Sequence, residues 1–130
     1  MQVLLILAIA VHVLSSIFWA GSTFVLARNG GQGATGLIGP QTGAASAAVL
    51  SGLLLWHLLH RGSFQLVEQV LATGAAAAIL AFLIQLLLVR PALRSGEASP
   101  RVAGGYRASA ALLVVTIICK IGRASCRERV

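Results

Sequence analysis

The sequence contains few charged residues and no aspartate. Only 10% of its 130 residues are charged, its acids are three glutamates, and 58% of its residues are hydrophobic. In a soluble domain about a quarter of the residues are charged. This composition excludes an ordinary soluble domain and makes lipid the solvent for most of the chain. We therefore predict an all-α integral membrane protein, a four-helix transmembrane bundle that forms one domain.

The scarcity of acids also limits the chemistry. A nucleophile, a base and an orienting acid cannot be assembled, so we predict no catalytic residues and a non-enzymatic binder or transporter component. The two cysteines, Cys119 and Cys126, have no spacing typical of a disulfide framework or a zinc site. The net charge of +7 lies between the apolar runs and is not interleaved with aromatic residues, so we predict no nucleic-acid partner.

Four apolar runs predict the helices, at about residues 3–27, 37–59, 66–89 and 108–119. The first run has no basic segment before it, so we interpret it as a membrane span and not as a signal peptide. Arg90-Pro91 is expected to end the third helix, and residues 90–107 to form a polar loop. The small-residue spacing of Gly39 and Gly43 predicts close helix packing.

The last ten residues, 121–130, resemble the translation of a common sequencing-library adapter at all ten positions. The preceding two adapter bases would complete the codon of Lys120. The run that ends at Cys119 is also short for a bilayer, since 12 residues of helix span only about 18 Å. We therefore expect residues 1–119 to be the transmembrane domain with its fourth helix truncated, and residues 120–130 to be a non-native tail. Without that tail six arginines and two glutamates remain, for a net charge of +4.

The arginines are unevenly distributed between the loops. The second loop has only Arg61, whereas the first and third loops share five: Arg28, Arg90, Arg94, Arg101 and Arg107. The positive-inside rule then places loops 28–36 and 90–107 in the cytoplasm and the native N-terminus outside the cell membrane.

Three histidines are candidate ligands. His12 shares one face of the first helix with Ser16, Trp19 and Thr23, within about 60° of arc, so we expect this polar stripe to face the bundle. A histidine at membrane depth is a candidate metal or haem ligand, although it could simply hydrogen-bond a neighbouring helix.

His57 and His60 lie three residues apart at the end of the second helix, and Glu68 begins the third across a short turn. Imidazole and carboxylate together suit a transition metal, so we predict a metal site formed by His57, His60 and Glu68. His12 would be a second metal ligand deeper in the membrane. The alternative is that these groups only anchor helix ends among lipid headgroups. Near Val3 the first helix enters the membrane, which puts His12 about 13 Å deep and disfavours a bis-histidine haem shared with His57.

The sequence resembles the copper resistance protein D family in three features. These are His12 followed by Trp19 and Gly21 in the first helix, Gly52 in the second, and Arg90-Pro91 at the end of the third. This resemblance implies a small four-helix membrane protein that handles copper or another transition metal. The same histidine pattern is similar to that of membrane-bound protoporphyrinogen oxidases, which would make His12 a haem ligand. A third hypothesis is a structural subunit of a membrane complex. The expected partners are the lipid bilayer, a metal ion, and a second copy or another membrane subunit.

Overall fold

The computed structural model describes residues 2–59, 66–96 and 100–128, and the side chains of 2–59, 68–96 and 100–122. The described chain is helical. Its elements are α1 (Gln2–Arg28), α2 (Ala34–Leu59), α3 (Leu66–Ile84), the π-helical turn η1 (Gln85–Val89), α4 (Arg90–Arg94) and α5 (Pro100–Glu128). The predicted all-α four-helix bundle is confirmed.

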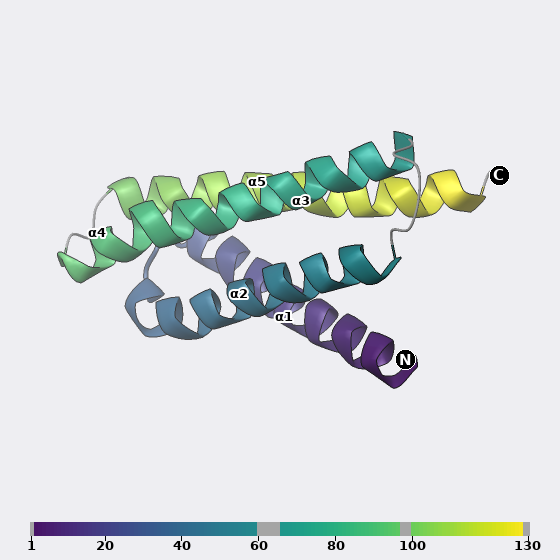
Figure 1. The fold of residues 1–130 in the computed structure, drawn as a ribbon. Helices are drawn as coiled ribbons and strands as arrows, with labels where there is room; N and C mark the ends of the chain where they lie inside the picture. Colours follow the sequence, from purple (N-terminus) through teal and green to yellow (C-terminus); the bar gives the residue numbers. More distant parts are fainter. Residues whose placement is uncertain (1, 60–65, 97–99, 129–130) are drawn as a thin grey trace.

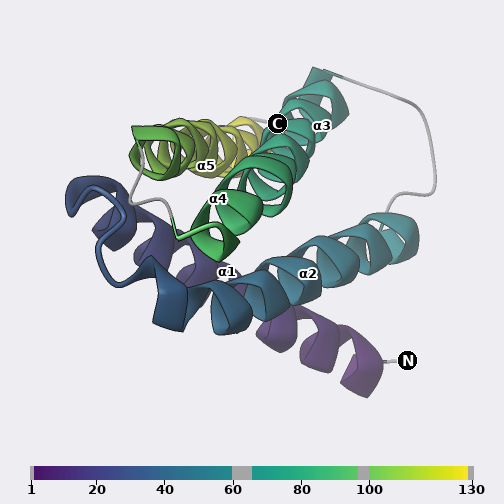
Figure 2. The ribbon, with the colours of Figure 1, turned by 90° about the vertical axis from the view of Figure 1, so that its left-hand side faces the viewer.

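The helices form two packed pairs that meet along one seam (Figures 1 and 2). α1 packs on α2 and α3 on α5, and α1 also contacts α5, whereas α2 and α3 touch at few residues. The start of α1 and the end of α5 lie at one end of the bundle, and the connection 29–33 and residues 95–96 after α4 lie at the other (Figure 1). The first of these ends is called the terminal end below, and the second the arginine end, since it carries Arg28, Arg90, Arg94, Arg101 and Arg107.

Among the described residues, four helical segments are long and apolar enough to cross a membrane: Gln2–Arg28, Ala34–Leu59, Glu68–Arg94 and Pro100–Gly122. Most of the large hydrophobic side chains on α1 are exposed on the outside of the bundle. An apolar outer surface around a partly polar interior is compatible with an integral membrane protein.

The prediction that Arg90-Pro91 ends the third helix is wrong. The helical path passes through η1 and α4 to Arg94. Pro91 lacks the N–H that an α-helix interior needs, but the π-helical turn before it widens the backbone, and the N–H of Arg90 bonds to the Gln85 carbonyl. This wide turn lets the chain continue past the proline.

The fourth helix begins at Pro100, eight residues before the predicted start, so most of the predicted loop 90–107 is helical. Proline is favoured in a first helical turn. Gly105 then allows a close approach to η1, because a Cβ at this position would lie 2.5 Å from Val89 Cγ2. From Pro100 to Cys119 the helix already spans about 30 Å, so the length argument for truncation no longer applies. The match to the adapter does not depend on that length.

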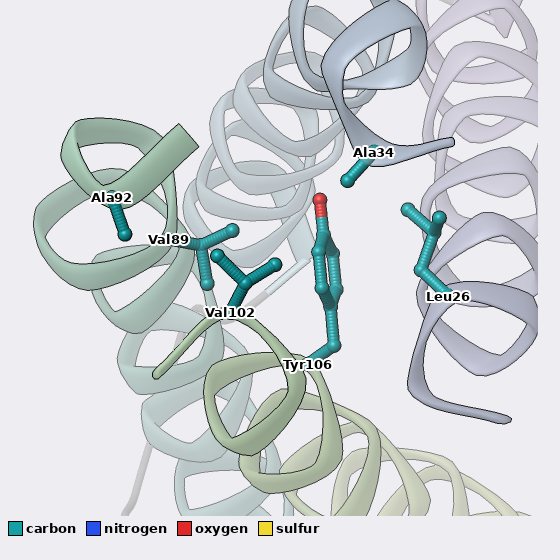
Figure 3. Packing of buried hydrophobic residues seen from close by; sticks show 6 residues of the cluster. All are labelled: Leu26, Ala34, Val89, Ala92, Val102 and Tyr106. Carbon is teal, nitrogen blue, oxygen red and sulfur yellow. The ribbon is translucent and has the colours of Figure 1, made fainter. Parts of the chain in front are cut away.

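Two hydrophobic clusters fill the bundle. One lies near the arginine end, where Tyr106 stands between Leu26 and Ala34 on one side and Val89 and Val102 on the other (Figure 3). The second surrounds Trp19, whose indole meets the Phe82 ring edge to face, with centroids 6.3 Å apart. The predicted packing at Gly39 and Gly43 is wrong within this chain, because a Cβ at either position would meet nothing within 4 Å.

Candidate functional site

His12 lies on the inner side of α1, where its half-buried ring faces α2. Its Nδ1 atom is 2.9 Å from the carbonyl oxygen of Ala48 and 3.2 Å from Ser51 Oγ. A carbonyl oxygen can only accept a hydrogen bond, so Nδ1 must carry the proton. In the neutral ring the other nitrogen, Nε2, then keeps its lone pair.

The Nε2 atom of His12 points towards α5. Its neighbour there is the side-chain nitrogen of Lys120, at 2.9 Å, which donates to the Nε2 lone pair. Lys120 is the residue whose codon we expect the adapter to complete. A histidine that donates from one ring nitrogen to a backbone carbonyl and presents the other nitrogen unprotonated has the arrangement typical of a metal ligand.

Gly52 makes room for the His12 ring. A Cβ at this position would lie 3.0 Å from His12 Cε1 and 3.4 Å from Nδ1. A side chain at position 52 would therefore press on the imidazole, and the ring would have to shift. Thus Gly52 and His12, which both belong to the pattern noted in the sequence, are in direct contact.

Of the predicted group of His57, His60 and Glu68, the structure describes only His57 and Glu68, so the group stays a prediction. His57 is exposed near the end of α2, Glu68 is half-buried in the first turn of α3, and His60 lies outside the described residues. Within the described part of the chain, no group of three His, Cys, Asp or Glu side chains could hold a metal ion. His12 lies deeper than His57, because its contact Ser51 precedes His57 by six residues, about 9 Å of helix.

A second polar feature joins all four spans in the half of the bundle nearer the arginine end. Trp19 Nε1 donates to Gln85 Oε1 over 2.8 Å, and Gln85 Nε2 donates to Thr23 Oγ1 over 2.9 Å. Gln41 Nε2 also donates to Thr23 Oγ1, over 3.0 Å. Tyr106 Oη donates to Gln41 Oε1 over 3.0 Å. We call these five buried residues the four-helix network.

The four-helix network is satisfied within the protein. Thr23 Oγ1 accepts from both glutamines and donates to the Trp19 carbonyl over 2.7 Å. Gln41 Nε2 donates a second bond, to Ser22 Oγ, over 3.0 Å. Over the described residues, no buried side-chain nitrogen or oxygen lacks a hydrogen-bond partner. Such a network holds helices in register and offers little to a ligand.

The polar stripe predicted on the first helix is confirmed, since Trp19 and Thr23 are buried and His12 and Ser16 are half-buried. The sequence reasoning missed Gln41, Gln85 and Tyr106. The available signal was the presence of two uncharged amides inside long apolar runs, because an amide in a membrane span must find a partner on another helix.

In comparisons with known proteins, no family model, curated protein or solved structure matches the chain.

Proposed function

We propose that this chain is a metal-handling membrane protein of the copper resistance protein D kind, in which His12 is the ligand inside the bundle. The proposal rests on which nitrogen of the His12 ring carries the proton. The Ala48 carbonyl fixes the proton on Nδ1 and so leaves Nε2 as a Lewis base directed at α5. Neutral imidazole is a good ligand for copper and zinc ions.

His57, His60 and Glu68 form the outer part of the proposed site. His57 lies near the end of α2 and Glu68 at the start of α3, both at the terminal end of the bundle, and His60 follows α2 in the sequence. In this proposal they collect a metal ion from the aqueous phase, and His12 receives it about two turns deeper. The excess of arginine at the opposite end supports a cytoplasmic location for that end, so the metal would enter from outside.

Metal titration of the purified chain in detergent tests the proposal. We expect copper or zinc binding that weakens at least tenfold in His12→Ala, because the ligand inside the bundle is lost. We also expect weaker binding in the double variant His57→Ala, His60→Ala. Ser15→Ala is a matched control, since the Ser15 hydroxyl bonds only to carbonyls of its own helix.

Each alternative has its own signature in this experiment. Haem that copurifies with the chain and is lost only in His12→Ala would assign the protein to the haem-binding class. Metal binding that is unchanged in both histidine variants, with no haem present, would refute the metal-handling function. The remaining hypothesis would then be a structural subunit of a membrane complex.

A further inference from the structure

The arginine end carries a strong positive charge on a small area. Four of its five arginines are exposed, and Arg90 is half-buried. Along the sequence, segments 28–36 and 90–107 carry these five arginines and one glutamate, for a formal charge of +4. The arginines come from the end of α1, from α4 and from the start of α5, which lie at the same end of the bundle in Figure 1.

A cavity of about 520 Å³ opens at this end of the bundle. Its walls include the glycine-rich segment 30–33, Leu93 at the end of α4, and Val102 and Ala103 at the start of α5. The volume falls in the range of small-molecule pockets, about 300–1,000 Å³. The cavity can therefore hold a group much larger than a single ion.

Three arginines flank the cavity along the chain. Arg28 precedes its first lining residue, Gly30, by two positions, Arg94 follows Leu93, and Arg101 precedes Val102. All three side chains are exposed. The described residues that line the cavity include no arginine, so these three are its neighbours in the sequence. Arginine binds phosphate through a fork of parallel N–H donors, so a phosphodiester is the ligand chemistry that such neighbours favour.

We propose that this cavity binds the headgroup of an anionic phospholipid such as phosphatidylglycerol. The cavity lies where the four spans end, which is the level of the lipid headgroups. Leu93, Val102 and Ala103 give it an apolar wall, against which the glycerol and the first acyl carbons of a lipid can pack. Basic pockets between membrane helices are known to take anionic lipid headgroups.

The test is native mass spectrometry of the full chain from micelles that contain equal amounts of phosphatidylglycerol and phosphatidylcholine. We expect the chain to retain phosphatidylglycerol preferentially. Because each arginine near an anionic surface contributes a factor of about five, the double variant Arg94→Gln, Arg101→Gln should lower this preference about 25-fold. Both substitutions are on exposed side chains.

Two further variants separate the cavity from general charge attraction. Ala103→Phe fills the cavity and keeps every arginine, so it should also reduce the preference. Arg61→Gln removes one arginine from the sequence between α2 and α3 and should have no effect. Equal retention of both lipids, an unchanged double variant, or an equal loss in Arg61→Gln would refute the proposal. Displacement of the lipid by millimolar inorganic phosphate would assign the cavity to free phosphate instead.

Discussion

Gln41 is the residue on which the four-helix network depends most, and Gln41→Leu should destabilise the bundle. Leucine keeps the size of the side chain but removes three hydrogen bonds, to Tyr106 Oη, Ser22 Oγ and Thr23 Oγ1. Interhelical hydrogen bonds in membranes contribute about 0.6 kcal/mol on average and up to about 1.7 kcal/mol. The three bonds together therefore account for about 2 kcal/mol.

The Tyr106 hydroxyl adds a further cost in this variant. Tyr106 is fully buried, so without Gln41 its O–H has no partner, which costs about 1–3 kcal/mol. We expect a total loss of about 3–5 kcal/mol for Gln41→Leu. Tyr106→Phe alone removes one bond and leaves the buried Gln41 Oε1 without its partner, so it should cost about 2–4 kcal/mol.

The double variant is the sharper test. Because Tyr106→Phe also removes the orphaned hydroxyl, the double variant should be no less stable than Gln41→Leu alone. Thr42→Val is the matched control, since the neighbouring Thr42 hydroxyl bonds only to the Ile38 carbonyl of its own helix. We expect this control to cost less than about 0.5 kcal/mol.

The assay is reversible unfolding in mixed detergent micelles, in a Trp56→Phe background so that fluorescence reports the buried Trp19. If the losses in the free energy of unfolding of the two single variants simply add in the double variant, the direct Gln41–Tyr106 interaction is refuted. A Gln41→Leu variant as stable as Thr42→Val would refute the stabilising role of the whole network.

Three other predictions concern the histidine and the orientation. Gly52→Ala should weaken metal binding at least fivefold by displacing the His12 ring, whereas Gly39→Ala, which meets open space on the same helix, should leave it unchanged; equal effects in titration would contradict the contact. Lys120→Ala should tighten metal binding about tenfold, because it frees His12 Nε2, and an unchanged affinity would show that this nitrogen is not the ligand. Ser95→Cys, in a chain without its other cysteines, should resist an impermeant thiol reagent applied to intact cells, whereas a cysteine at the start of α1 should react; ready labelling of position 95 would reverse the orientation.

The number of helices and the face of α1 could be predicted because both depend on local patterns. Long apolar runs are required by the thickness of the bilayer, so four runs gave four spans. The stripe with Trp19 and Thr23 follows from the helical period of 3.6 residues and from the cost of exposing polar groups to lipid.

The helix ends around residues 90–107 could not be predicted because tertiary contacts override local signals there. Proline and glycine usually mark loops, but Pro91 follows a π-helical turn and Gly105 packs tightly against Val89. Both features depend on the partner helix, which the local sequence does not specify. The partners of Gln41 and Gln85 were hidden for the same reason, since each lies on a different helix.

The two polar features of α1, the four-helix network and His12, differ in how much of their hydrogen-bonding capacity is used inside the bundle. At Thr23 the hydroxyl accepts two hydrogen bonds and donates one, so it has no further capacity. At His12, Nδ1 donates a hydrogen bond to the Ala48 carbonyl. Nε2 accepts one from Lys120, which belongs to the tail that we expect to be non-native. The same face of α1 therefore joins the four spans near the arginine end and carries, two to three turns nearer the terminal end, the nitrogen that we propose as a metal ligand.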